Sequence, residues 1–198
     1  MESSYFSKHR LDALVDAVIA ITMTLLVLEL RIPEELPGDL LAAISHLEPK
    51  FISWIVSFLI LALYWRGYMQ ATVKLQHVDR RLFWIMILWL LATSVIPFSS
   101  SVLGDHNENP QAHLVYGINF IAVQIVVLAR NWYLRTHPEL FEGNDAGKAE
   151  LGSSAAVAVS ICALIAIAWA YAVQPDYAAV AYALVLPVNR LIERFAFD

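Results

Sequence analysis

Six long apolar segments, separated by short polar ones, take up most of this sequence. A helix needs about 20 mostly apolar residues to cross the hydrocarbon core of a bilayer. Segments that reach or approach this length are residues 11–30, 51–69, 82–103, 113–133, 151–173 and 177–191. The last segment is short and contains Pro187, so it is the weakest of the six. The pattern predicts an all-α polytopic membrane protein in which residues 1–198 form a single six-helix transmembrane domain.

The composition favours a lipid bilayer as the surroundings of so much apolar surface. Hydrophobic residues make up 59% of the chain and charged residues 16%, whereas a typical soluble domain has about half and about a quarter. A globule of this size lacks the interior volume to bury that excess. The net charge of −5 includes no basic run, so we expect no nucleic-acid partner. No cofactor and no obligatory protein partner is expected either.

The lysines and arginines test the number of spans independently, because cytoplasmic loops accumulate them. With six spans, eleven of the 13 lysine and arginine residues fall on one side of the membrane. Only Arg31 and Lys50 fall on the other side. An odd number of spans would scramble this asymmetry. The distribution therefore predicts that both termini are cytoplasmic.

The first apolar segment has a second interpretation, a cleaved export signal, because Lys8 and Arg10 precede it. Against that interpretation, Asp12 and Asp16 fall early in the segment, and no small-x-small cleavage pattern follows Leu30. We therefore expect the segment to remain as a membrane helix.

One face of this first helix carries a stripe of large apolar side chains. At about 100° per residue, Ile21, Leu25 and Leu28 lie within about 60° of one another. Leu14 and Arg10 continue the stripe towards the N-terminus, and Thr24 flanks it. Such a stripe is also what ordinary helix packing produces, so periodicity alone leaves its role open.

Asp12 and Asp16 point away from this stripe. Ionisable groups inside a membrane span are costly and normally find partners. The polar residues expected on the same side of the membrane are Arg10, His77, Asp79, Arg80 and Arg81. We therefore expect a buried polar network that joins the first helix to the loop after the second span. The alternative is that both aspartates merely face interfacial water.

Three blocks of the sequence carry a resemblance to a known family. The first block reads Arg10, Leu14-Val15-Asp16, Ala20-Ile21 and Thr24-Leu25-Leu26-Val27-Leu28. The second pairs Trp65 with Leu75, Asp79 and Leu82, and the third is IPFSSSVL at 96–103. Together they resemble the bacterial six-helix potassium channels related to transmembrane protein 175, the endosomal and lysosomal potassium channel. The likeness covers the first half of the chain, and the last three spans match only in number and length.

Two departures from the family pattern concern the polar network. The phenylalanine and serine usual before the aspartate are Leu14 and Val15 here, so a hydrogen bond from that serine is absent. The histidines often found after the tryptophan are Tyr68 and Met69.

The resemblance implies a homotetramer in a bacterial inner (plasma) membrane, with the first helix of each six-helix subunit lining a central pore. The expected function is a channel with a modest preference for potassium over sodium, and potassium is its only expected metal ion. Its filter and gate is an apolar constriction in place of a Thr-Val-Gly-Tyr-Gly carbonyl filter. The residues implied in the constriction are Ile21, Leu25 and Leu28, with Thr24 and Leu14 flanking the pore. The residues implied in the supporting polar network are Arg10, Asp16, Trp65, His77 and Asp79.

The alternative function is a secondary transporter of a small cation or solute. Such a protein uses broken helices and polar groups near the middle of the membrane. The candidates for those groups are Pro97, Pro187, Asn119 and Gln124, although the last two side chains more often form interhelical hydrogen bonds. We expect no enzyme, because LGSSA at 151–155 lacks a Gly-x-Ser-Gly pattern and no His-Glu-x-x-His occurs. Residues 34–49 are either a solvated loop or a short acidic helix that concentrates cations near a pore mouth.

Overall fold

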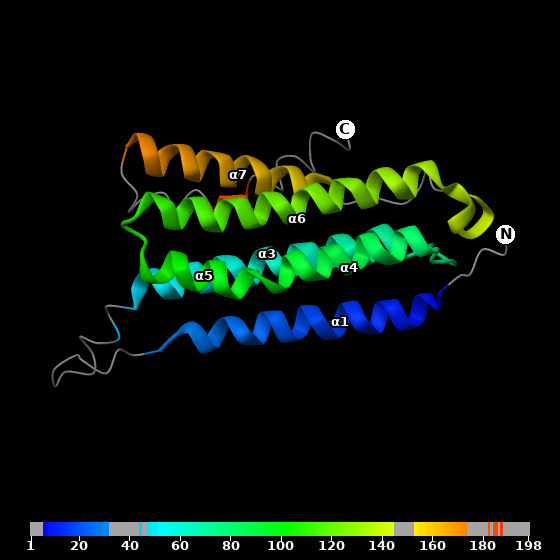
Figure 1. Cartoon of the computed structure of the whole chain (residues 1–198), viewed down its shortest axis with the longest axis horizontal. Helices are drawn as coiled ribbons and strands as arrows, with labels where there is room; N and C mark the ends of the chain where they lie inside the picture. The colour runs from blue at the N-terminus through cyan, green and yellow to red at the C-terminus, as the bar shows by residue number, and fades with distance from the viewer. Residues whose placement is uncertain are drawn as a thin grey trace.

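The structure is a computed structural model in which long helices run side by side (Figure 1). It describes residues 6–31, 44, 47–144 and 153–173, and positions 182, 184, 185 and 187. The helices are α1 (Lys8–Leu25), η1 (Leu26–Glu29), α3 (Glu48–Thr72), α4 (Arg80–Ser94), α5 (Ile96–Asp105), α6 (Pro110–Thr136), η2 (Pro138–Leu140), η3 (Glu142–Asn144) and α7 (Ser153–Ala172). Apart from two isolated bridges, these residues form no β-structure. The all-α prediction is confirmed.

Four helical segments are long and apolar enough to cross a membrane. They are Lys8–Glu29, Glu48–Thr72, Arg80–Asp105 and Pro110–Thr136. They coincide with the first four predicted segments, and α7 coincides with the fifth. The sixth predicted segment, 177–191, and the acidic segment 34–49 lie mostly outside the described residues. The number of six spans therefore stays a prediction.

Local sequence chemistry accounts for where several helices begin and break. The Asp79 carboxylate caps α4 by accepting a hydrogen bond from the Leu82 backbone N–H (2.9 Å). The Asn109 side chain accepts from the Gln111 N–H (2.9 Å) at the start of α6. The third apolar segment is divided into α4 and α5 at Val95, two residues before Pro97, which has no N–H to donate to the helix.

The helices are arranged in layers, with α1 along one edge (Figure 1). α3, α4 and α5 occupy the middle, and α6 and α7 lie on the side away from α1. α6 packs against α7, α5 and α4, whereas α1 packs against α4, α3 and α5. One broad face of α1 therefore has no partner within the described part of the chain.

Most of the interior is apolar, and its polar side chains bind one another across helices. Ser57 of α3 donates a hydrogen bond to Ser100 of α5 (3.0 Å) and shares another with the Tyr116 hydroxyl of α6 (2.7 Å). Gln124 of α6 donates to the Tyr64 hydroxyl of α3 (2.9 Å). Such bonds link helices in a medium that offers no water as a substitute.

Asn119 of α6 spans the break between α4 and α5. Its amide nitrogen donates to the Ala92 backbone carbonyl on one side of the break (3.1 Å). Its amide oxygen accepts from the Ser99 hydroxyl on the other side (3.0 Å). Asn119 thereby ties both sides of the break to α6.

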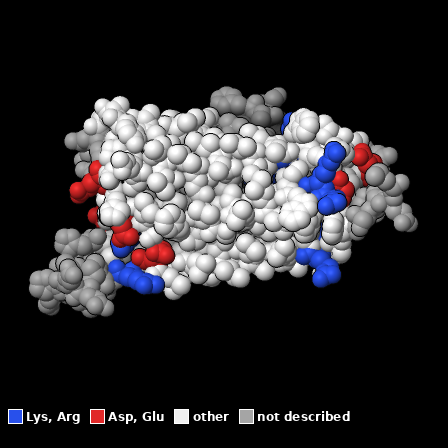
Figure 2. Space-filling model, in the orientation of Figure 1, with Lys and Arg blue, Asp and Glu red and all other residues white. Residues whose placement is uncertain are grey.

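Charged side chains lie near the two ends of the bundle, and the face shown between them carries none (Figure 2). One end includes the ion pair between Lys50 of α3 and Asp105 of α5. The uncharged band between the ends matches the hydrocarbon core of a bilayer.

Candidate functional site

The two faces of α1 differ sharply in burial. The face that packs against the bundle consists of Leu11, Val15, Ile19, Thr22 and, in η1, Leu26. The predicted stripe lies outside this face: Ile21 is 58% exposed, Leu25 42% and Leu28 54%. Leu14 and Thr24 are exposed as well. The isolated chain thus presents its predicted constriction residues as an uncovered apolar surface.

The end of α1 tightens into the 3₁₀ turn η1, which changes the shape of the stripe. In an α-helix, Leu28 would lie about 60° from Leu25. In a 3₁₀-helix, side chains three residues apart eclipse one another, so Leu28 is brought towards a position directly over Leu25. The Thr24 hydroxyl donates to the Ile21 carbonyl (2.8 Å), which leaves the lone pairs of its oxygen facing away from the helix.

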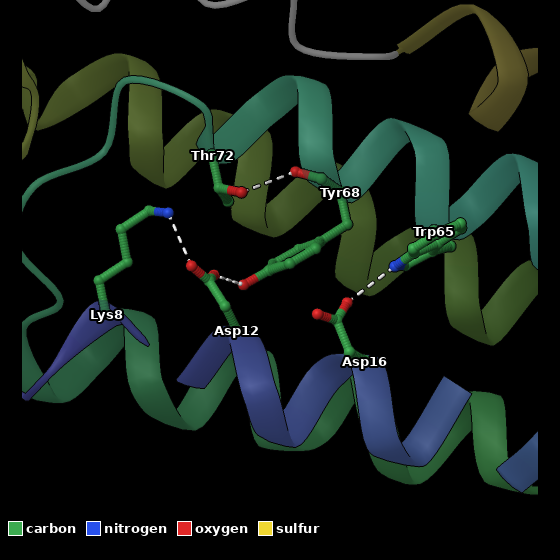
Figure 3. Close-up of polar contacts among 6 residues, drawn as sticks. All are labelled: Lys8, Asp12, Asp16, Trp65, Tyr68 and Thr72. Atoms are coloured by element: carbon green, nitrogen blue, oxygen red, sulfur yellow. Dashed lines mark hydrogen bonds and ion pairs between the residues drawn. The ribbon is translucent and has the colours of Figure 1, made fainter. Parts of the chain in front are cut away.

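Asp16, on another side of α1, binds α3. Its Oδ1 accepts a hydrogen bond from the indole Nε1 of Trp65 (2.8 Å), and the two side chains reach towards each other across the gap between the helices (Figure 3). The contact is exposed to solvent in the chain, so Asp16 is not buried as the sequence led us to expect. The bond is one of two direct side-chain links between α1 and α3.

One turn earlier, Asp12 forms a second link to α3. Its Oδ1 accepts from the Tyr68 hydroxyl (2.5 Å), and its Oδ2 pairs with the Lys8 ammonium of the same helix (2.7 Å) (Figure 3). The Thr72 hydroxyl donates to the Tyr68 backbone carbonyl (2.9 Å), and the Tyr68 ring stacks on Trp89 at 5.7 Å between centroids. Tyr68 thus supplies a hydrogen-bond donor from α3 to α1.

Asp79 belongs to a separate group of contacts. Besides capping α4, its carboxylate accepts a hydrogen bond from the Tyr133 hydroxyl of α6 (2.6 Å). Its two oxygens therefore hold α4 and α6 together at the end of the bundle where α1 begins. His77 lies two residues earlier, and its backbone N–H donates to the Leu140 carbonyl (3.2 Å).

The predicted network is thus divided between helix pairs. The structure brings Asp16 and Trp65 together between α1 and α3, and it places Asp79 between α4 and α6. Arg10 is exposed and has no hydrogen bond or ion pair with another described residue. Arg10 and Asp16 do not meet because they lie on different faces of α1, and Arg10 lies on the face of the apolar stripe.

Three residues that bind the aspartates were not predicted from the sequence. They are Lys8, Tyr68 and Tyr133. The spacing of Lys8 and Asp12, four residues apart on one helix, was a usable signal for an ion pair. No comparable signal exists for Tyr68 or Tyr133, because each binds a residue more than fifty positions away. Among the described residues, no group of three His, Cys, Asp or Glu side chains is arranged to hold a metal ion.

We expect Trp65→Phe to destabilise the protein. The substitution keeps an aromatic ring but removes the donor to Asp16, so a carboxylate at a helix–helix contact loses its partner. Because this bond is exposed in the chain, the expected loss is about 0.5–1.5 kcal/mol in the free energy of unfolding, measured as a lower midpoint temperature of unfolding in detergent. The matched control is Trp84→Phe on the exposed face of α4. Equal shifts for the two variants would contradict a stabilising role for the Asp16 bond.

A family model matches the N-terminal part of the chain. The model for the endosomal/lysosomal potassium channel TMEM175 matches residues 10–97, which include α3, α4 and all of α1 except its first two residues. The residues of the predicted constriction, Asp16, Trp65 and Asp79 fall within this range, whereas Tyr133, which binds Asp79, lies outside it.

Three curated relatives are named as potassium channels. One from Streptomyces collinus is 29% identical over 138 residues, 67% of this chain. One from a Chryseobacterium species is 32% identical over 117 residues, and one from Chamaesiphon minutus is 30% identical over 124 residues. The matched regions cover 67%, 58% and 61% of these relatives' own lengths. The names of these three relatives are those of channels and not of enzymes, which agrees with the expectation from the sequence.

Two solved structures share the fold over nearly the whole chain. A lysosomal potassium-selective channel TMEM175 homolog from Chamaesiphon minutus matches with a TM-score of 0.68 at 20% identity, covering 95% of both chains. A variant of the potassium channel MtTMEM175 bound to a nanobody–MBP fusion matches with a TM-score of 0.63 at 16% identity, covering 98% of this chain and 97% of that one. The chain therefore has the apolar spanning helices and the fold of these multi-pass membrane proteins, and its residues 10–97 match the TMEM175 family model.

Proposed function

We propose that the chain is one subunit of a homotetrameric potassium channel whose central pore is lined by α1. The observation that carries the proposal is the uncovered apolar stripe of Ile21, Leu25 and Leu28 on a helix within the family-matched region. We take potassium as the permeant ion because the three relatives are named as potassium channels. The stripe supplies a place where four copies can form stacked apolar rings around a fourfold axis.

The position of α1 in the fold supports this arrangement. α1 lies along one edge of the bundle (Figure 1), so four copies can bring their α1 helices together without opening the interior. The face that packs against α3, α4 and α5 is already occupied, and the stripe lies outside it. In this proposal, residues 1–198 of each subunit form a single six-helix channel domain.

The proposed constriction sorts ions by the cost of dehydration. A narrow apolar ring expels water and ions by dewetting, and a small movement of the helices rewets it. Potassium holds its hydration shell less tightly than sodium, so it passes such a ring more readily. The oxygen of Thr24 beside Ile21 offers partial replacement for lost water. The resulting selectivity is modest, because no cage of backbone carbonyls surrounds the ion.

The polar contacts give α1 a fixed rotation. A turn of α1 about its axis would break the Asp16–Trp65 and Asp12–Tyr68 bonds together. Ile21 and Leu25 are therefore kept in one orientation relative to α3. We propose that Asp16 and Trp65 support the pore helix in this way, and that Asp79 and the loop containing His77 support it indirectly by fixing α4 and α6.

The proposed location is a bacterial inner membrane with both termini in the cytoplasm. Lys8, Arg10, Arg80 and Arg135 lie at the end of the bundle where α1 begins. Arg31 follows η1 and Lys50 begins α3, both at the opposite end. This distribution is the one expected when the N-terminal end of α1 faces the cytoplasm.

The transporter alternative gains no support from its candidate residues. Asn119 and Gln124 hold neighbouring helices through hydrogen bonds, and Pro97 lies at a break that Asn119 bridges. Substrate sites in transporters instead use polar groups that face a cavity.

Purified protein in liposomes tests the proposal. We expect potassium influx driven by a potassium gradient, a smaller sodium influx under the same conditions, and potassium currents that do not saturate as a carrier's flux does. Empty liposomes are the control. Potassium flux that saturates and requires a counter-transported ion would favour the transporter, and the absence of flux would contradict a channel.

A further inference from the structure

Arg10 is the one charged side chain on the stripe of α1. It precedes Ile21 by eleven residues, or about three helical turns, so the two side chains point within about 20° of each other. At a rise of about 1.5 Å per residue, Arg10 lies about 16 Å from Ile21 along the helix axis. α1 is a continuous α-helix from Lys8 to Leu25, so this relation holds along its length.

The charge of Arg10 is not neutralised within the part of the chain that the structure describes. No hydrogen bond or ion pair joins it to another of these residues. The neighbouring cation behaves differently, because the Lys8 ammonium pairs with Asp12 at 2.7 Å on the side facing α3 (Figure 3). Asp16 faces Trp65, also towards α3. Among the described residues, the stripe therefore ends in a positive charge that belongs to no ion pair, while the Asp16 carboxylate, bound by a neutral donor, lies on the side that faces α3.

We infer that four copies of Arg10 form a cationic ring at the cytoplasmic mouth of the pore, and that this ring limits potassium current in the outward direction. The inference rests on the proposed function, since it needs the tetramer with α1 on its axis. It assigns Arg10 an electrostatic role at the mouth, separate from the apolar constriction and from the contacts that hold α1 to α3.

The physical reason is local depletion of cations. Positive charges at a pore mouth lower the potassium concentration there, so fewer ions are available to leave from that side. Exposed charges act over about 10 Å at 0.1 M salt and about 3 Å at 1 M. The depletion is therefore strong at low salt and nearly absent at high salt. Ions arriving from the other side meet the ring only after the constriction, so inward current is reduced less.

Single-channel recordings of the full-length protein in planar bilayers test the ring. In symmetrical 0.1 M KCl, the wild type is expected to pass unequal unitary currents at equal voltages of opposite sign. Arg10→Gln is expected to raise the smaller current roughly two- to threefold and to bring the ratio of the two currents close to one. At 1 M KCl the unitary currents of the wild type and the variant should agree, because the charges are screened. Since each channel supplies its own ratio, its orientation in the bilayer does not affect the comparison.

Two further variants separate charge from structure. Arg10→Glu should raise the smaller current beyond that of Arg10→Gln. Arg135→Gln removes an exposed arginine from the last turn of α6, on the side of the bundle away from α1 (Figure 1), and should leave both currents unchanged.

Equal currents in wild type and Arg10→Gln at 0.1 M, or a change that persists at 1 M, would overturn the cationic ring while leaving the channel proposal intact. A wild-type protein that carries no potassium current would overturn the proposed function and the ring with it.

Discussion

Ile21→Asn is expected to increase potassium conductance about tenfold and to bring the potassium-to-sodium permeability ratio close to one. Four asparagine amides around the proposed ring would hold water in the constriction, so the dewetting barrier would fall. A fall of about 1.4 kcal/mol multiplies the rate of crossing about tenfold. A wet constriction no longer requires ions to shed their hydration, so potassium loses its advantage. Bi-ionic reversal potentials and unitary currents measure both effects.

The matched control is Ile125→Asn. Ile125 is an exposed isoleucine of α6, in the layer away from α1. The same chemical change at this position should leave unitary conductance and permeability ratio unaltered, even where it lowers the yield of folded protein. Unchanged conductance and selectivity in Ile21→Asn would remove Ile21 from the filter, and equal changes in both variants would mean that the effect is not specific to the stripe.

The long helices could be predicted because their signal is local. A run of about twenty apolar residues identifies a span without reference to the rest of the chain. The separation of α1 into two faces could be predicted for the same reason. A fixed angle per residue places Ile21 and Leu25 on one face of the helix and Asp16 on another. Periodicity could not tell which of these faces packs inside the chain. The structure shows that Val15 and Ile19 do so and that Ile21 does not.

The partners of the polar side chains were harder to predict, because several residues compete for each one. Asp79 follows a loop and precedes a helix, so it caps α4, and its remaining oxygen is bound by Tyr133. These bonds leave it outside the contact that Asp16 makes with Trp65. The sequence shows which charged residues lie on the same side of the membrane. Which of them meet depends on the rotation of α3 and α6 about their axes, and the sequence does not show that rotation.

Backbone irregularities were only partly visible in the sequence. Pro97 indicates a break in the third span, but nothing near it indicates that Asn119 of α6 binds both sides of the break. The 3₁₀ turn from Leu26 to Glu29 has no proline or glycine to mark it. Its consequence, the alignment of Leu28 with Leu25, depends on a change in helical twist that a uniform periodicity cannot contain.

Gly117→Leu is expected to destabilise the protein by about 3 kcal/mol, at the upper end of the usual cost of overpacking. Gly117 lies where α6 and α7 pack together. A Cβ atom at this position would lie 2.5 Å from Cδ1 and 2.9 Å from Cγ1 of Ile167, and 3.3 Å from the Tyr182 hydroxyl. A leucine therefore enters only if the Ile167 side chain changes its conformation or α7 moves away. The midpoint temperature of unfolding in detergent, together with the yield of monodisperse protein, measures the loss.

A compensating substitution distinguishes steric overlap from other effects of losing the glycine. Ile167→Ala removes the two atoms that a Cβ at position 117 would meet, so Gly117→Leu combined with Ile167→Ala nearly conserves the volume between α6 and α7. Volume-conserving exchanges usually cost less than about 1.5 kcal/mol, and we expect the double variant to recover at least half of the loss. Ala122→Leu places the same side chain at an exposed position of α6 and should change stability little. Additive losses in the double variant would contradict direct contact between these two positions as the cause.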